Sequence, residues 1–344
     1  MTIVTLGIDI AKHVFQLHGV DATGTVILRK QLPRKRLLDY LSNLEPCLVG
    51  IEACGSSHYW ARQIALLGHD VRLMPAHYVK PYVKRNKTDA ADAAAICEAV
   101  TRPDMRFVAV KSAEQQALLL NHRSRELLVK QRTMLVNAVR GHMAEFGVVV
   151  AQGLRNIPKL ADLLDKHPDE LIPDEAKGLL RMLFAQINSL NEKVVALEKR
   201  IALWHKKDEA CQRLSTIPGV GPMTATAIVA SIGDGHLFAS GRAFAAWLGL
   251  TPREYSSGGK QQMGGISKQG DGYIRRLLVH GARAVVRMRT REGAPPSPWL
   301  DGLLARKHRN AATVALANKN ARMAWVILTR GEIYQRDKAV TVTA

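Results

Sequence analysis

Short apolar runs, separated by turn-forming residues, alternate with polar positions over the first hundred residues. Three such runs, over 2–10, 13–21 and 25–33, follow one another with short connections, which predicts an antiparallel meander of strands. Two further apolar runs, over 46–54 and 70–76, each follow a helical pattern. This order of elements predicts an α/β layer structure with a mixed sheet.

From about Ser112 onward, apolar residues recur at the spacing of an α-helix. A long helix or helix pair is predicted over 113–147, whereas the prolines in 148–178 indicate a loop-rich segment. Apolar residues then recur at alternating steps of four and three from Leu183 to Trp204. This spacing predicts a coiled-coil seam, within the chain or between chains, or else the apolar face of an ordinary amphipathic helix.

The remaining sequence predicts a mostly helical C-terminal part. Residues 214–233 place Pro-Gly-Val-Gly between an apolar lead and a helix, which is typical of a helix-hairpin-helix. Gly219 and Gly221 would let backbone N–H groups approach a phosphate at the helix N-terminus, although a plain helix connection has the same pattern. A loop rich in glycine and serine is expected over 251–278, followed by basic helices.

The net charge of the chain indicates which class of partner it binds. Its 49 lysines and arginines exceed its 30 aspartates and glutamates, giving a net charge of +19 that is spread along the whole sequence. Such a surface favours a polyanion, and nucleic acid more than an anionic membrane. The 344 residues suffice for two domains. The four cysteines fit neither a zinc site nor a redox pair, and the sequence has no signal-peptide pattern or long apolar run, so we expect a soluble protein.

An alanine-rich stretch that should be helical opens with two acids, Asp89 and Asp92. Thr88 or Asp89 can cap this helix, and acids in a first turn are favoured by the helix dipole. The two carboxylates also share one helix face, where they repel each other unless a cation lies between them. Mg²⁺ prefers such oxygen ligands, so this stretch alone fits both a capped helix and a metal site.

Two more acids interrupt the ends of apolar strands, Asp9 in "GIDIAK" and Glu52 in "VGIEAC". Neighbouring strands can bring such acids to one rim of a sheet, where the helix with Asp89 and Asp92 would complete a cluster of four. A cluster of this kind can hold one or two Mg²⁺ ions that polarise a phosphate. Basic residues before the helix would hold a nucleic-acid backbone beside it: Lys84, Arg85 and Lys87.

Four stretches now resemble a known family: "GIDIAK", "GIEACGSSHYWAR", "KTDAADAAAI" and "LGLTPREYSSGGKQQMGGISKQGDGYIRRLL". They are similar to the DEDD transposases of bacterial insertion sequences, in the insertion-sequence one-ten family and its eleven-eleven-like subgroup. The resemblance implies a RuvC-like, RNase H-type catalytic domain over 1–110, and a helical and coiled-coil region for nucleic-acid binding and dimerisation over 111–210. It also implies a C-terminal transposase domain over 211–344, mostly helical, with the helix-hairpin-helix and a catalytic serine loop.

The resemblance also assigns roles. The family's metal ligands fall on Asp9, Glu52, Asp89 and Asp92. Its serine nucleophile falls on Ser257, with Ser256 beside it. The implied activity is that of a DNA recombinase, which cuts and exchanges strands through a 5′-phosphoserine intermediate at a composite site containing Mg²⁺, or Mn²⁺ in its place.

The partners that the resemblance implies are donor and target DNA and a structured noncoding "bridge" RNA that pairs with both. A homodimer that assembles into a tetramer is expected, in the bacterial cytoplasm at the nucleoid and without a membrane. The candidate nucleic-acid contacts outside the acid cluster are Arg123, Arg132, Gly219, Gly221, Lys260, Lys268, Arg275 and Arg276.

Two other functions fit the residues. A RuvC-like nuclease would use the same metal site with water as the nucleophile, and a nucleic-acid-binding scaffold would use no catalysis at all. Without the resemblance, the residues support a metal-dependent enzyme that acts on nucleic acid. A covalent protein–DNA adduct that depends on Ser257 separates the recombinase from the nuclease.

Overall fold

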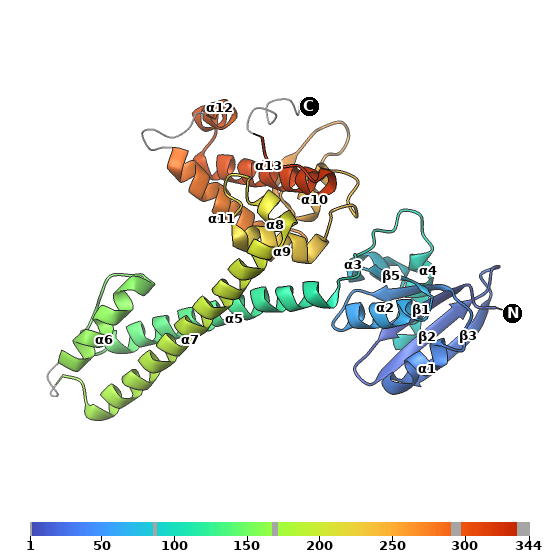
Figure 1. The fold of residues 1–344 in the computed structure, drawn as a ribbon, viewed down its shortest axis with the longest axis horizontal. Coiled ribbons are helices and arrows are strands. Elements are labelled where there is room, and N and C mark those ends of the chain that lie inside the picture. The colour runs from blue at the N-terminus through green and yellow to red at the C-terminus, as the bar shows by residue number, and fades with distance from the viewer. Residues whose placement is uncertain (1, 85–87, 167–170, 290–296, 336–344) are drawn as a thin grey trace. The chain divides into compact units, whose positions relative to one another are not determined.

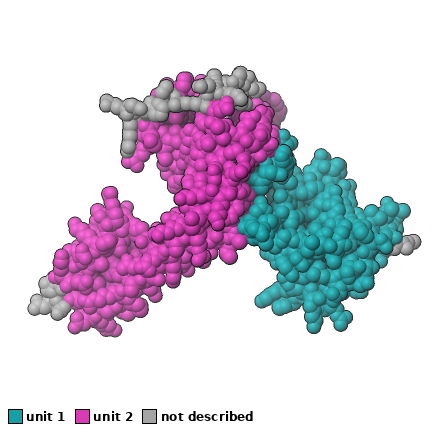
Figure 2. All heavy atoms as spheres, in the orientation of Figure 1, with its two compact units in different colours: residues 1–115, 232–239 teal, residues 116–231, 240–344 magenta. Residues whose placement is uncertain are grey.

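The computed structural model of the chain describes residues 2–84, 88–166, 171–289 and 297–335. It divides into two compact units (Figure 2). The first contains residues 1–115 and 232–239, and the second contains residues 116–231 and 240–344. Across the described ranges, the helices lack a stretch that is long and apolar enough to span a bilayer.

A mixed sheet in the order β3-β2-β1-β4-β5 forms the centre of the first unit (Figure 1). Its first three strands, β1 (Thr5–Ile10), β2 (Val14–Val20) and β3 (Val26–Pro33), pair antiparallel. The other two, β4 (Leu48–Glu52) and β5 (Asp70–Met74), continue the sheet in parallel from β1. The predicted meander, and the later strands joined by helices, are confirmed.

Helices cover both faces of this sheet. One face packs on α1 (Leu37–Leu41) and α2 (Ser57–Ala65), with Leu6, Ile8 and Ile51 among the fully buried strand residues. The opposite face packs on α4 (Asp89–Val100). The short helices of this unit are η1 (Arg34–Arg36), α3 (Ala76–Val79) and η2 (Lys80–Tyr82).

Glycines in the two central strands let α4 lie directly against the sheet. A Cβ added at Gly7 of β1 would lie 2.2 Å from the carbonyl oxygen of Ala93, and one added at Gly50 of β4 would lie 2.8 Å from Cβ of Val100. Both distances are shorter than any real Cβ contact, so the approach of α4 requires glycine at these positions. The helix is thereby held close over β1 and β4.

Two long helices of the second unit pack antiparallel (Figure 1). Trp204, near the end of α7 (Asp174–Lys207), packs against the beginning of α5 (Ala113–Ala144), whereas Phe184 shares a core with Met143 at the end of α5. Between these two contacts, an ion pair of Arg125 with Glu198 joins α5 to α7. The predicted seam therefore packs within the chain, and pairing between chains stays a prediction.

The prediction of a loop-rich segment over 148–178 is wrong for the middle of that segment. A 3-10 turn, η3 (Leu154–Asn156), leads there into the ten-residue helix α6 (Ile157–Lys166). Pro158 misled the prediction, but it occupies the first turn of α6, where a missing N–H leaves no hydrogen bond broken. Leu160 and Leu164 of α6 are buried in the core shared with α5 and α7.

The rest of the second unit is a helical bundle. Its helices are α8 (Glu209–Leu214), α9 (Pro222–Ile232), α10 (Gly241–Trp247), α11 (Gly272–Arg289), α12 (Pro298–Arg306) and α13 (Arg309–Arg330). The long helix α13 packs against α8, α10, α11 and α12, and most side chains of α9 are buried. Gly219, in the loop before α9, lies against Gly281 of α11, where a Cβ on Gly281 would lie 1.8 Å from the carbonyl oxygen of Gly219. Close packing therefore requires both glycines.

The prediction of a loop over 251–278 is also wrong, because these residues form a hairpin and the start of a helix. Strands β6 (Pro252–Glu254) and β7 (Met263–Ile266) pair antiparallel, and α11 begins as early as Gly272. The Asp271 carboxylate caps α11 by accepting hydrogen bonds from the N–H groups of its first turn. The strands are exposed, so they lack the alternation by which half-buried strands are predicted.

Replacing Gly7 by alanine tests the contact between α4 and the sheet. The new Cβ would meet the backbone of Ala93 and Cys97, so we expect the free energy of unfolding to fall by about 1–3 kcal/mol. Urea denaturation measures this change. Gly141→Ala is the matched control, since the space at that helical glycine is open and the substitution should stabilise by up to about 1 kcal/mol. Equal stability of Gly7→Ala and the wild type would contradict the packing described here.

Candidate metal centre and serine hairpin

Three of the four predicted acids meet in the first unit. Asp9, near the end of β1, and Asp89 and Asp92, in the first turn of α4, each place a carboxylate oxygen within 4.8 Å of the others. Three hard oxygen ligands at this spacing suit Mg²⁺ or Mn²⁺. The residues present therefore fit the divalent cation that the sequence predicts.

The start of α4 explains how its two aspartates become available. Thr88 is the N-cap, because its hydroxyl accepts a hydrogen bond of 3.2 Å from the N–H of Ala91. Neither carboxylate is needed for capping, although both lie in a first turn that favours negative charge. The capped helix and the metal site, which the sequence left as alternatives, are compatible in one structure.

The fourth acid, Glu52, lies beside the group of three. Parallel pairing sets Gly7 opposite Gly50 and Ile8 opposite Ile51, so Asp9 and Glu52 follow at the same end of adjacent strands. Since side chains alternate along a strand, Asp9 and Glu52 share the α4 face with the two glycines. Glu52 is not a member of the group whose ligand atoms all lie within 4.8 Å of one another, but its charge acts on Asp9.

The cluster is electrostatically unfavourable as a set of bare carboxylates. Burial, and then the charges of Asp89, Asp92 and Glu52 in that order of importance, together raise the pKa of Asp9 to about 6. A carboxylate in such surroundings binds a proton or a cation more readily than one in water. A divalent ion would replace that proton and relieve the repulsion among the acids.

One neighbour of the cluster was not predicted. The thiol of Cys54 lies two residues beyond Glu52, and its pKa is raised by burial and then by the charges of Glu52 and Asp9. Sequence reasoning treated it as an ordinary free cysteine, although its position after a candidate ligand was a usable signal. Lys84, on the basic flank, is exposed, whereas Arg85 and Lys87 lie outside the described residues.

The predicted nucleophile lies at the tip of the β6–β7 hairpin. The N–H of Lys260 donates to the carbonyl oxygen of Ser257 at 3.0 Å, closing a tight turn. Gly258 and Gly259 occupy its centre with φ of 56° and 77°. Positive φ at both central residues is what a tight hairpin turn of the primed type requires, and glycine adopts it without strain.

The two adjacent serines differ in their contacts. The Ser256 hydroxyl donates to the Glu254 carboxylate at 2.7 Å and accepts from the N–H of Gln262 at 3.2 Å. Within the part of the chain that is described, the exposed Ser257 hydroxyl makes no hydrogen bond. A carboxylate that accepts a serine proton can serve as its base. Sequence reasoning missed Glu254, whose spacing of two from Ser256 on a strand puts both on one face.

Several predicted phosphate contacts already hold the fold of the second unit. The guanidinium of Arg275 donates to the carbonyl oxygens of Leu248 and Gln269, and that of Arg132 donates to Asn191. Gly219 serves packing, as described above. The others are open: Arg123, Lys260 and Lys268 are exposed, and the Cβ position of Gly221 faces free space.

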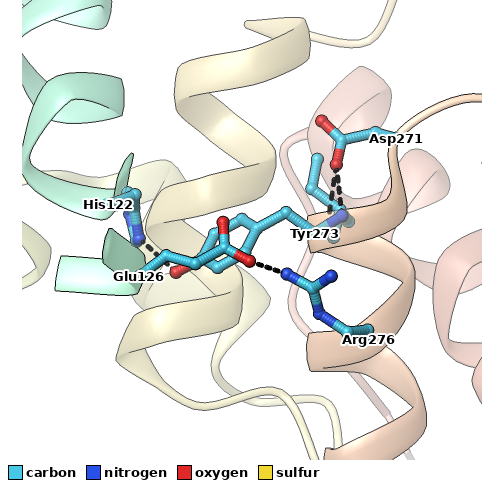
Figure 3. A network of polar contacts seen from close by, with 6 residues as sticks. His122, Glu126, Asp271, Tyr273 and Arg276 are labelled. Carbon is cyan, nitrogen blue, oxygen red and sulfur yellow. Dashed lines mark hydrogen bonds and ion pairs between the residues drawn. The ribbon is translucent and has the colours of Figure 1, made fainter. Parts of the chain in front are cut away.

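Arg276 belongs to a network that joins α5 and α11 (Figure 3) and extends to α9. It pairs with Glu126 of α5. Buried His122 of α5 lies 2.9 Å from the Tyr273 hydroxyl of α11 and 3.0 Å from the Thr226 hydroxyl of α9. Burial, and then the charge of Arg125, lower the pKa of His122 to about 4, so this histidine stays neutral at neutral pH. The network therefore ties three helices of the second unit together.

Comparison with known proteins gives two family matches and several full-length relatives. A model described as "Transposase IS116/IS110/IS902 family" matches residues 211–295, and a DEDD transposase model matches residues 6–147. A probable family 20 transposase of Pseudomonas aeruginosa is 49% identical, over 97% of this chain and 99% of its own. The transposase of element IS1111A from Coxiella burnetii is 40% identical over 96% and 91%, and that of IS1328 from Yersinia enterocolitica is 39% identical over 97% and 99%.

The elevated pKa of Asp9 predicts how Asp9→Asn changes stability with pH. A carboxyl whose pKa is raised in the folded chain binds its proton more tightly when folded, so folding loses stability as pH rises from 3.8 to about 6. In EDTA, Asp9→Asn should therefore raise the melting temperature at pH 8 and leave it nearly unchanged at pH 4. Differential scanning calorimetry measures both, with exposed Asp104→Asn as the control. An equal loss of stability at both pH values would contradict the repulsion.

Proposed function

Because the chain belongs to the IS116/IS110/IS902 family of insertion-sequence transposases, we propose that its acid cluster and its hairpin serine act together in cutting and rejoining DNA strands. The observation that carries the proposal is the convergence of Asp9, Asp89 and Asp92 within 4.8 Å. Strand-end acids on β1 and β4 under a crossing helix support a RuvC-like, RNase H-type catalytic unit.

The acid cluster would hold Mg²⁺, or Mn²⁺ in its place, through Asp9, Asp89 and Asp92, with Glu52 as the fourth acid. When bound, the ion polarises a phosphate oxygen of the scissile bond. The protein's own contribution is to fix the ligands: Gly7 and Gly50 set the distance of α4 from the strands, and Thr88 fixes where α4 begins. Lys84 and its basic neighbours would hold the DNA backbone beside the cluster.

The Ser257 hydroxyl oxygen would attack the scissile phosphorus. A Ser257–O–P bond forms, the bond from phosphorus to the 3′ oxygen breaks, and the serine proton leaves to a base. The leaving 3′ oxygen takes up a proton, so the products are a 5′-phosphoserine and a free 3′ hydroxyl. A 3′ hydroxyl from another strand then attacks the phosphoserine, releasing the serine and rejoining DNA without any outside energy source. Gly258 and Gly259 allow the exposed tip to reach a strand.

Ser256 is the alternative candidate for the nucleophile. Its hydroxyl already donates to Glu254, which would activate it, whereas Ser257 is the residue that matches the family motif. The two hydroxyls are one residue apart on a hairpin, where neighbouring side chains point to opposite sides. The two serines can therefore be separated by single substitutions.

The partners follow from charge and from an exposed apolar row. The net charge of +19 fits donor and target DNA together with a structured bridge RNA that pairs with both. On α5, Leu120, Leu127 and Met134 recur every seven residues and are 55–64% exposed, which suits helix pairing with a second copy.

We propose a dimer that assembles into a tetramer in the bacterial cytoplasm, at the nucleoid. The dimerisation region would be 111–210, which follows the catalytic domain 1–110 in the sequence and precedes the transposase domain 211–344.

A RuvC-like nuclease is the second candidate, because the acid cluster lies wholly within the first unit and does not contain the serine. In that function a water molecule replaces Ser257 as the nucleophile. Both candidates need the acids, so the serine decides between them.

Asp89→Asn should lower strand cleavage by at least about a hundredfold, because it removes a carboxylate that would hold the ion. Cleavage of labelled element-end DNA in Mg²⁺ measures the loss. Glu98→Gln is the matched control on the same helix, since Glu98 pairs with Arg102 and lies outside the cluster. Cleavage at the wild-type rate by Asp89→Asn would favour a scaffold without this catalytic site.

Ser257→Ala should abolish the covalent protein–DNA adduct and strand exchange, because no nucleophilic oxygen remains. The adduct is detected as labelled DNA that migrates with the protein in a denaturing gel. Ser256→Ala, one residue away, should retain the adduct. Loss of the adduct in Ser256→Ala alone would transfer the role to Ser256 with Glu254 as its base. Cleavage without any adduct in the wild type would favour the nuclease.

A further inference from the structure

A large groove in the second unit runs beside the serine hairpin. It encloses about 1820 Å³ and is lined by residues of β6 and β7 together with α10, α12 and α13. Pro252 and Gly265, one from each strand of the hairpin, belong to its lining. A chain bound in this groove would therefore contact the same hairpin that carries Ser257 at its tip.

The groove is electropositive. Arg242, Lys319 and Arg322 line it, against a single acid, Glu332, in the described part of the lining. Among the residues that the structure describes, neither Arg242 nor Arg322 forms an ion pair with an acid. The pKa of Lys319 is lowered by burial and then by the charge of Arg322. An anion placed between these cations would relieve their repulsion.

The groove also offers an aromatic surface. Trp299 belongs to its lining and is 43% exposed, although large aromatic side chains are usually much more buried. The Lys319 ammonium lies 4.3 Å from the centre of the Trp299 ring and holds it by a cation–π contact. Trp325 and Tyr334 continue the aromatic lining. An exposed tryptophan beside unpaired cations is the combination by which proteins bind single-stranded nucleic acid.

We propose that this groove binds a single-stranded stretch of the DNA next to the phosphate that the hairpin serine attacks. A base stacks on Trp299, and the backbone phosphates lie near Arg242 and Arg322. A base in a duplex is already stacked, so the tryptophan selects an unpaired strand. The choice of DNA rests on the proposed function, since a strand that continues from the groove along the hairpin reaches the serine where DNA is cut. An apolar peptide would leave the three cations without counter-charges.

Fluorescence anisotropy of the full chain with a labelled single-stranded DNA oligonucleotide tests the stacking and the charge. Trp299→Ala should weaken binding about tenfold, and Trp299→Phe should restore most of it, because phenylalanine can still stack. Arg242→Glu should weaken binding more than Arg306→Glu, a matched charge change at an exposed position outside the lining. Equal affinity of Trp299→Ala and the wild type, or equal effects of the two arginine changes, would overturn the proposal.

Photo-cross-linking identifies the strand in the assembled complex. Bromouracil is placed in the DNA beside the cut site, and the cross-linked peptide is found by mass spectrometry. An adduct on the peptide that contains Trp299 supports the groove, whereas an adduct only with the RNA, or occupation of the groove by another part of the chain, overturns it. Both assays work in EDTA with Ser257→Ala, so they do not depend on the chemistry. The proposed function fails separately, if strand exchange survives the loss of Ser257.

Discussion

The contact between α4 and two glycines of the sheet determines the geometry of the candidate metal centre. Gly7 and Gly50 lie opposite each other on adjacent parallel strands, and any side chain there would collide with α4. Because strand side chains alternate, the acids that follow at this end of the sheet point toward the helix. The same packing that buries the alanines of α4 therefore brings its first turn over Asp9. Both the packing of the core and the geometry of the candidate metal centre depend on the close approach of α4 to β1 and β4.

This arrangement places charges together that would otherwise separate. The pKa of Asp9, raised to about 6, reflects burial and three neighbouring acids, and such a local conflict is typical of a functional site that the rest of the fold supports. The positive charge of the chain lies apart from this cluster: it is spread along the whole sequence, and Arg242, Lys319 and Arg322 line the groove beside the serine hairpin. In the proposed function, the acid cluster therefore holds metal and the basic surfaces hold nucleic acid.

Much of the first unit could be predicted because its strands are apolar and its helix carries a strong alanine pattern. Asp9 and Glu52 were found as polar interruptions of buried strands, but the sequence could not show that Glu52 lies outside the closest group, since that depends on side-chain distances of a few ångströms. The hairpin over 252–266 was missed because both faces are exposed, and α6 because Pro158 resembles a helix breaker. The contact of Glu254 with Ser256 needed the hairpin register first.

The geometry of β1, β4 and α4 leads us to expect that their carboxylates hold a divalent ion together. Anomalous diffraction from crystals grown with Mn²⁺ can detect that ion. We expect one or two peaks within coordination distance of Asp9, Asp89 and Asp92, with Glu52 on the same ions, and no such peak in crystals of Asp9→Asn. Well-ordered carboxylates with no peak among them at saturating Mn²⁺ would show that this cluster does not bind metal.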